Sequence, residues 1–135
     1  MEEQGDFEQF MEARKEASDK FIEGNFDALK RISAEHSPAT IFGPKGDCVQ
    51  GVDRVNEANA TGARHFKPGG TNTFEIMHMA ADDRLAYWVG IQRSVVNMQG
   101  KDSAVPMDLR VTEIFRRDGA KWKLVHRHAD KLASA

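Results

Sequence analysis

The chain of 135 residues has the length of one ordinary domain, and its 40% hydrophobic and 30% charged residues allow a buried core and a pocket. The formal net charge of −2 gives no overall attraction to nucleic acid or to an anionic membrane. Cys48 is the only cysteine, which excludes an internal disulfide and fits a reducing compartment. The longest apolar run, residues 85–91, is too short to span a bilayer, and the acidic residues 1–6 are unlike a signal peptide. We therefore expect a cytoplasmic protein with a single domain over residues 1–135.

The first half of the chain carries mainly helical signals. Apolar side chains from Phe7 to Phe21 recur every three or four residues, which predicts a long amphipathic helix that stops at Gly24. Asn25 is expected to cap a short second helix. In chain order, the later predicted elements are a helix over 26–32, short strands over 40–42 and 48–50, and a helix after Gly51 that ends near Gly62.

The second half changes to a strand pattern rich in Val, Ile, Phe, Trp and Thr. After a predicted loop over 67–70, strands are expected over residues 71–79, 85–97, 107–117 and 121–128. The links between them are short, and Asp118-Gly119 is a strong hairpin signal, so neighbouring strands should be antiparallel. Helices followed by a meander predict an α+β fold, with helices on one face of a curved antiparallel sheet.

Charge is unevenly distributed along the chain. Residues 1–27 contain nine acidic and three basic residues, whereas residues 110–135 contain seven basic and three acidic ones. Either these segments form two solvated faces of opposite charge, or the two ends lie close together or meet across a subunit contact.

The C-terminal third resembles a known family. The segments LRVTEIFRRDG (109–119) and KWKLVHRHAD (121–130) resemble the closing hairpin of SnoaL-like proteins. These belong to the NTF2-like superfamily, together with ketosteroid isomerase, scytalone dehydratase, limonene epoxide hydrolase and the association domain of calmodulin-dependent kinase II. The likeness also covers the first helix, GNFDAL (24–29), ATIFGP (39–44) and LAYWVG (85–90). It implies a cone-shaped, cystatin-like α+β barrel with a pocket between helices and sheet, and a homodimer formed through the outer sheet face.

The catalytic patterns of two relatives do not transfer to this chain. Ketosteroid isomerase needs a carboxylate base in an Asp-Pro step, which reads Gly43-Pro44 here, and a tyrosine on the first helix, whereas Tyr87 is the only tyrosine. Its oxyanion-hole aspartic acid aligns with Thr112 or Glu113. Asp108 and Arg110 could belong to the Asp-Arg-Asp set of limonene epoxide hydrolase, but their context differs. We therefore do not expect ketosteroid isomerase activity.

His126 and His128 are the main catalytic candidates. Two residues apart on a strand, they should share the face of the apolar Trp122 and Leu124, which predicts that they point inward. Imidazoles beside a pocket can act as general base and acid near neutral pH. Alternatively, they are structural, or they bind a metal together with His78. We predict no metal and no cofactor.

Further candidates flank the expected pocket. Arg110 and Glu113 lie on opposite faces of one strand, so that both line the pocket only if the strand bulges. An inward-facing Arg110 would hold an oxyanion or a carboxylate, and an exposed one would pair with a carboxylate on the next strand. The predicted catalytic residues are His126, His128 and Arg110, and the predicted substrate-binding residues are Trp88, Tyr87, Met77, His78, Thr112 and Glu113.

Two classes of function follow from the sequence. The first is a cofactor-free isomerase, cyclase or dehydratase that acts on a small apolar carbonyl metabolite. The second is a non-catalytic ligand-binding or oligomerisation module, supported by the missing base at Gly43. In both, the expected partner is a small apolar molecule and a second copy of the chain, with neither nucleic acid nor membrane.

Overall fold

The computed structural model describes residues 2–133, and side chains within residues 5–133. Met1, where the acidic N-terminal stretch begins, lies outside the described residues. The helices are α1 (Glu2–Phe21), α2 (Asp27–Ile32) and α3 (Val52–Ala63). The strands are β1 (Thr40–Phe42), β2 (Cys48–Gln50), β3 (Phe66–Ala81), β4 (Leu85–Met98), β5 (Val105–Asp118) and β6 (Lys121–Lys131). No helix in the described part of the chain is long and apolar enough to cross a membrane.

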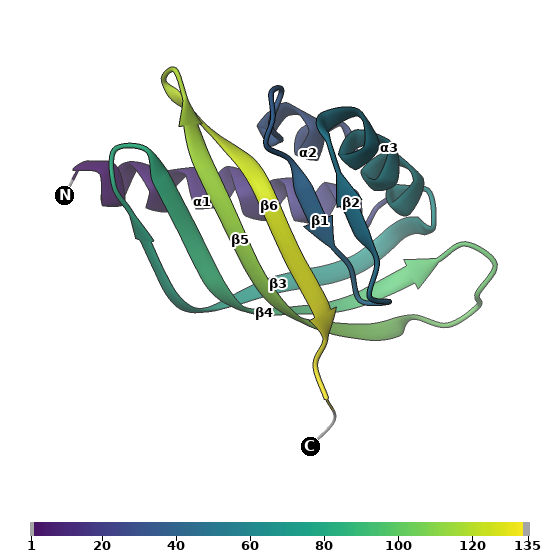
Figure 1. Ribbon diagram of the computed structural model, residues 1–135. Coiled ribbons are helices and arrows are strands. Elements are labelled where there is room, and N and C mark those ends of the chain that lie inside the picture. Colours follow the sequence, from purple (N-terminus) through teal and green to yellow (C-terminus); the bar gives the residue numbers. More distant parts are fainter. Residues whose placement is uncertain (1, 134–135) are drawn as a thin grey trace.

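The strands form one curved sheet in the order β2-β1-β6-β5-β4-β3, and the helices lie against one of its faces (Figure 1). All neighbouring strands are antiparallel except β1 and β6, which are parallel. The predicted α+β class, with N-terminal helices on a curved sheet, is confirmed. The prediction of a barrel is wrong, because β2 and β3 are the two open edges of the sheet. We call the face toward the helices the inner face and the other the outer face.

Helix α1 follows its predicted apolar stripe. Its buried side chains are Phe7, Met11, Arg14 and the adjacent Ala17 and Ser18, so buried positions recur every three or four residues. The chain then turns at Gly24, whose φ of 97° favours glycine, and a Cβ there would lie only 2.8 Å from the carbonyl oxygen of Phe66. The predicted cap is shifted by one residue: Phe26 stands at the N-cap of α2 without a side-chain cap hydrogen bond, and Asn25 Oδ1 accepts from the Asp27 backbone N–H at 2.9 Å just before the helix.

The strand β3 begins earlier than the sequence predicts. Residues 67–70 have a loop-like composition, yet they lie inside β3, because Phe66 and Lys67 already pair with Met98 and Asn97 of β4. The pairing with β4 is interrupted after Lys67 and resumes at Thr71, which pairs with Val95. Glycine and proline therefore mark an irregular stretch within the strand rather than its start.

A bulge in β6 changes which side chains face inward. Phe115 pairs with Leu124, but Ile114 pairs with His126, so Val125 is an extra residue on β6. Because one extra residue inverts the alternation, Trp122 and Leu124 face inward before the bulge, and Arg127 faces inward after it. The prediction that His126 and His128 share the face of Trp122 and Leu124 is therefore wrong.

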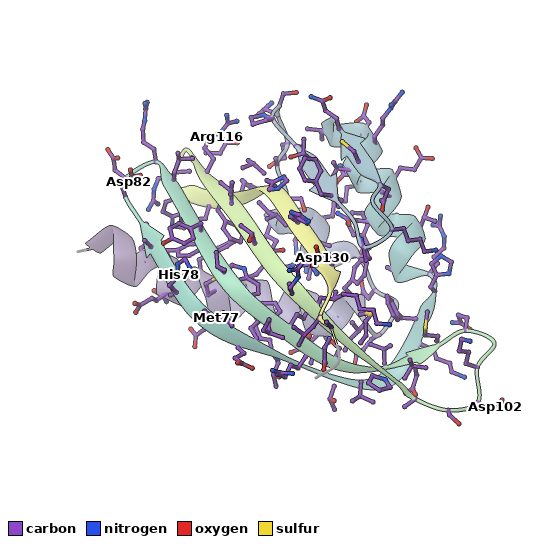
Figure 2. The ribbon with its side chains drawn as sticks, turned by 60° about the horizontal axis from the view of Figure 1, so that its bottom comes forward. Met77, His78, Asp82, Asp102, Arg116 and Asp130 are labelled. Atoms are coloured by element: carbon purple, nitrogen blue, oxygen red, sulfur yellow. The ribbon has the colours of Figure 1, made fainter. Side chains whose placement is uncertain are left out.

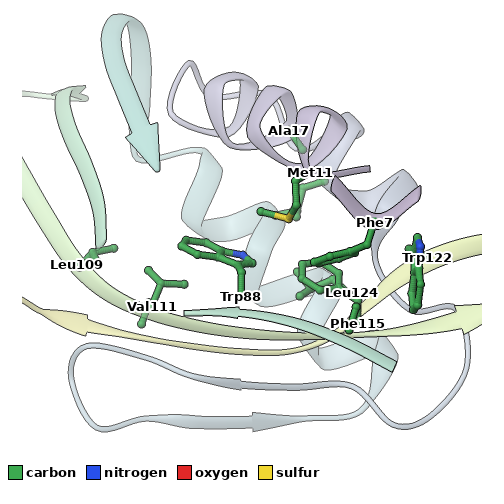
Figure 3. Packing of buried hydrophobic residues seen from close by; sticks show 12 residues of the cluster. Phe7, Met11, Ala17, Trp88, Leu109, Val111, Phe115, Trp122 and Leu124 are labelled. Atoms are coloured by element: carbon green, nitrogen blue, oxygen red, sulfur yellow. The ribbon is translucent and has the colours of Figure 1, made fainter. Parts of the chain in front are cut away.

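The main core lies between α1 and the inner face (Figure 3). Phe7 packs on Phe115 and on Trp122, with ring centroids 5.2 and 5.6 Å apart. The N-terminal helix thus lies on the C-terminal hairpin, and an ion pair between Asp6 and Arg117 at 2.8 Å joins them. Of the two interpretations of the uneven charge, the structure favours ends that lie close together.

Candidate functional site

A cavity of about 450 Å³ opens between the helices and the inner face of the sheet. Most of its lining is apolar, from α1, α2, α3 and the strands, and includes Phe21, Ile22, Leu29, Ile41, Val55, Phe66, Met98, Met107, Leu109, Leu124 and Val125. Polar side chains that also line it include Arg14 and Ser18 of α1, Gln92 of β4 and Arg127 of β6. The cavity therefore combines an apolar body with a cationic, hydrogen-bonding part.

A buried ion cluster adjoins this cationic part of the cavity. The Glu113 carboxylate, which is fully buried, accepts hydrogen bonds from Arg14 Nε and Nη2, both at 2.8 Å. Arg127 Nη1 donates to it at 2.8 Å, and the indole Nε1 of Trp88 donates at 2.7 Å. Two guanidinium groups thus surround one carboxylate, and the cluster carries one uncompensated positive charge.

The arginines determine the protonation state of Glu113. Burial alone would raise the pKa of this carboxyl group, but Arg14 and Arg127 outweigh burial and hold the pKa at about 2. Glu113 is therefore a carboxylate at any ordinary pH. A group with so low a pKa is a poor proton acceptor near neutrality, so the geometry assigns it to holding the arginines rather than to acid–base catalysis.

A chain of side-chain hydrogen bonds fixes the remaining polar groups. Arg127 Nη2 donates to Gln92 Oε1 at 2.8 Å, and Gln92 Nε2 donates to the Ser18 hydroxyl at 3.2 Å. Asn72 Nδ2 donates to the same hydroxyl at 2.9 Å, and the Ser94 hydroxyl donates to Asn72 Oδ1 at 2.9 Å. Such a connected network holds its members in one arrangement.

One donor of the cluster is left over. Arg14 Nη1 is buried and has no hydrogen-bond partner among the described residues. The Arg14 side chain is only 3% exposed, and its other two nitrogens are both bound to Glu113. A buried N–H without a partner costs free energy, about 1–3 kcal/mol, which an acceptor supplied by a ligand would recover.

Three of the predicted site residues lie at or near this cavity. Trp88 and Glu113 face inward and belong to the ion cluster that supports it. His126 borders the cavity, but its imidazole lies on the outer face, where Nδ1 is 2.7 Å from the Thr40 hydroxyl and the ring meets Phe42 edge-on. Burial, and then the neighbouring His128, lower the pKa of His126, which favours the neutral imidazole.

The other predicted site residues lie away from the cavity. Arg110 is 63% exposed and binds Asp130 through two hydrogen bonds of 2.6 and 2.7 Å, the exposed alternative considered above. His128 also faces Asp130, at 3.5 Å, and Thr112 pairs with His128 across the outer face. The expected positions of Arg110, His128 and Thr112 in the pocket are corrected, because strand alternation and the β6 bulge turn them outward.

The residues expected on β3 and β4 are corrected in the same way. Tyr87 and His78 form a hydrogen bond of 3.0 Å with each other on the exposed surface. Met77 is the extra residue of a bulge in β3 and is 63% exposed (Figure 2). Among the described residues, no group of three His, Cys, Asp or Glu side chains could hold a metal, so the three-histidine alternative has no support.

Sequence reasoning missed Arg14, Arg127, Gln92 and Ser18. A signal was present for Arg14, in combination with the predicted residue Glu113. Arg14 stands within the buried stripe of α1, and Glu113 falls between Val111 and Phe115 on the buried side of β5. Opposite charges at two buried positions predict an ion pair. Arg127 carried no such signal, because its inward position depends on the bulge at Val125.

An open, curved sheet covered by helices, with a cavity between the two layers, defines an NTF2-like α+β protein. The family model described as "SnoaL-like domain" matches residues 8–131, so this chain belongs to the SnoaL-like family. No curated protein matches the sequence.

Several solved structures share the fold. A candidate dehydratase of the NTF2-like family from Streptomyces avermitilis has a TM-score of 0.77 at 18% identity and covers 96% of this chain and 98% of its own. An NTF2-like superfamily protein from Salmonella enterica serovar Typhimurium has a TM-score of 0.77 at 11% identity, covering 95% and 92%. A candidate calcium/calmodulin-dependent protein kinase type II association domain from Thiobacillus denitrificans has a TM-score of 0.70 at 14% identity, covering 90% and 93%. At these identities the likeness establishes the fold and no activity.

Proposed function

We propose that the protein binds a small, mainly apolar molecule that carries a carboxylate or carbonyl group, with this group against Arg14. The observation that carries the proposal is the buried cluster of two arginines and one carboxylate beside an otherwise apolar cavity. An uncompensated buried charge is costly, and an anionic or strongly accepting ligand atom offsets that cost. The apolar walls supply the remaining binding free energy.

The dimensions of the cavity agree with this ligand class. A volume of about 450 Å³ lies within the range of roughly 300–1,000 Å³ that is usual for small-molecule pockets. The polar groups are confined to a few side chains that a hydrogen-bond network already holds in place. A preorganised polar end of this kind fixes the orientation of a ligand at little entropic cost.

A thermal-shift screen tests the proposal. Small organic acids are compared with the matching neutral alcohols, and an acid at about one hundred times its Kd should add roughly 2.7 kcal/mol, a shift of a few degrees. Arg14→Gln should abolish the preference for acids, whereas Arg110→Gln, the same change on the outer face, should leave it intact. Because Arg14 also supports folding, Val55→Phe provides a second variant, which fills the cavity and leaves the ion cluster in place. Equal binding by Val55→Phe and the wild type would refute the placement of the ligand in this cavity.

A second candidate function is a cofactor-free isomerase or dehydratase that uses His126 for proton transfer. It is favoured by the lowered pKa of His126, a residue that borders the cavity although its imidazole lies on the outer face beside Thr40. The Thr40 hydroxyl at 2.7 Å would hold the ring in place. For a ligand found in the screen, His126→Gln should then abolish turnover without changing the Kd. Unchanged turnover in this variant would exclude the role.

We also propose a homodimer formed through the outer face of the sheet. Its support is a set of exposed apolar side chains on that face, among them Phe42, Leu85, Val95 and Ile114. Apolar groups gathered on one face of a sheet are typical of an interface. Sedimentation equilibrium at micromolar concentration should give a dimer, and Val95→Lys with Ile114→Lys should give a monomer. A monomeric wild type would refute this interface.

The charge and the single cysteine bear on the partners and the compartment of the protein. The net charge of −2 supports neither nucleic acid nor an anionic membrane as a partner. Cys48 is exposed and free, which supports a reducing, cytoplasmic compartment and a single domain without disulfides. Intact-mass measurement after exposure of the purified protein to glutathione redox buffers would show whether Cys48 stays reduced at cytoplasmic potentials.

A further inference from the structure

A second cleft, of about 510 Å³, lies apart from the cavity described above, which reaches α3. It is bordered by the first turns of α1, the end of α2 and the start of β6. Phe10 and Ile32 contribute apolar side chains, and both pack against the main core. The cleft shares no lining residue with the cavity described above.

The charged side chains around this cleft are mainly cationic. Arg31, Lys121 and Lys123 line the cleft with one carboxylate, Asp6, and the Glu35 carboxylate lies close to Lys121 and Lys123. Asp6 is already paired with Arg117 at 2.8 Å, and Lys123 with Glu35 at 3.0 Å. In the described part of the chain, the side chains of Arg31 and Lys121 have no hydrogen bond or ion pair. The cleft therefore has two cations that no ion pair holds, although Lys121 lies near enough to Glu35 to help lower the pKa of that carboxyl group.

Trp122 adds an unused hydrogen-bond donor. Its side chain is 4% exposed, and its indole Nε1 is buried without a hydrogen-bond partner among the described residues. The ring cannot easily turn to find one, because the Arg117 guanidinium lies over it, 4.1 Å from its centroid, and the Phe7 ring packs on it in a T-shaped arrangement. Figure 3 shows Phe7 and Trp122 next to each other. Buried indole N–H groups usually have an acceptor, so this one indicates a missing partner.

We propose that this cleft is a second binding site, separate from the cavity, for a small organic carboxylate with an apolar body. One carboxylate oxygen would accept the hydrogen bond of Trp122 Nε1, and the other would pair with Arg31 or Lys121. The apolar body would lie on Phe10 and Ile32. A carboxylate fits the chemistry of this cleft because it offers two acceptor oxygens, one for an indole N–H and one for a cation.

The two tryptophans of the chain allow the sites to be observed separately. In a ¹H–¹⁵N spectrum of the full chain, Trp88 reports on the ion cluster beside the cavity, and Trp122 reports on the cleft. Trp122→Phe assigns the two indole signals. The probe is 2-naphthoate, and the control is 2-naphthamide, which has a similar shape and no charge.

We expect 2-naphthoate to move the Trp122 indole signal and the amide to leave it in place. Arg31→Gln with Lys121→Gln should raise the Kd measured from this signal at least tenfold, because both cations are lost. Arg54→Gln with Lys101→Gln, which removes the same charge elsewhere on the surface, should change the Kd less than twofold. The four positions are exposed, so the variants should fold.

The same titration overturns the inference in three ways. The first is a Trp122 signal that does not move with millimolar 2-naphthoate, and the second is a signal that moves equally with 2-naphthamide. The third is the same Kd in the two double variants. Movement of the Trp88 signal alone would support the proposed cavity ligand and reject the cleft. Movement of the Trp122 signal alone would support the cleft and count against the cavity, so the two proposals fail separately.

Discussion

Replacing Glu113 by Gln should destabilise the protein by about 3–5 kcal/mol, the usual cost of removing one partner from a buried ion pair. The structure shows why the cost is high. Glu113 accepts four hydrogen bonds, from Arg14 Nε and Nη2, Arg127 and Trp88, and three of them come from cations. Glutamine is close in shape but offers one acceptor oxygen, and its own N–H groups would face guanidinium donors. Two buried positive charges would remain without a counter-charge.

Urea unfolding followed by circular dichroism measures this loss, with Asp130→Asn as the matched control. Asp130 forms the same kind of double hydrogen bond with Arg110, but at the surface, where solvent screening leaves such pairs with little effect on stability. The pH dependence gives an independent check. Because the pKa of Glu113 falls from 4.5 to about 2 on folding, its stabilisation is complete above pH 4.5 and is lost as the pH falls toward 2. That loss, about 3 kcal/mol, should be absent in Glu113→Gln. Equal destabilisation by the two variants would refute the reasoning.

Two further predictions concern packing. Gly90→Ala should lower the melting temperature by several degrees, because the new Cβ would overlap the backbone carbonyl oxygen of Glu75 on β3. Gly5→Ala is the control: the space around its Cβ is open, so the melting temperature should stay nearly unchanged. Phe115→Ala should cost about 3–5 kcal/mol in urea unfolding because the ring is fully buried, and Ile114→Ala, one residue away and 36% exposed, should cost clearly less. Similar losses for Phe115→Ala and Ile114→Ala would contradict the assignment of inner and outer faces.

The elements of this fold could be predicted from sequence because their signals are local. The spacing of Phe7 and Met11 marks the buried side of α1, and Asp118-Gly119 marks the last hairpin. The start of β3 could not be predicted, because Phe66 joins the sheet through pairing with Met98, a residue distant in the chain. Long-range pairing outweighs the local preference of Pro68 and the glycines for a loop.

The candidate site was predictable only where it did not depend on a bulge. Glu113 and Trp88 follow the simple alternation of their strands, and their inward position agrees with it. His126 and Arg127 exchange faces because Val125 adds one residue to β6, and no local signal in the sequence identifies that residue as the bulge. The two histidines were therefore predicted on the inner face but lie on the outer face, while Arg127 between them lies on the inner face.

The arrangement of charges favours binding over proton transfer in the cavity. A general base works best when its pKa is near the working pH, and Arg14 and Arg127 hold the pKa of Glu113 far below that range. The arginines in turn are fixed by Glu113 and Gln92, so the cationic end of the cavity needs no rearrangement to receive an acceptor atom. If the protein is also an enzyme, His126 would transfer the proton. The turnover rate should then drop at acidic pH, where the imidazole becomes protonated. The affinity for a ligand at Arg14 would not change with the protonation of His126. Measuring the Kd and the turnover rate over the same pH range would therefore separate the two functions within one protein.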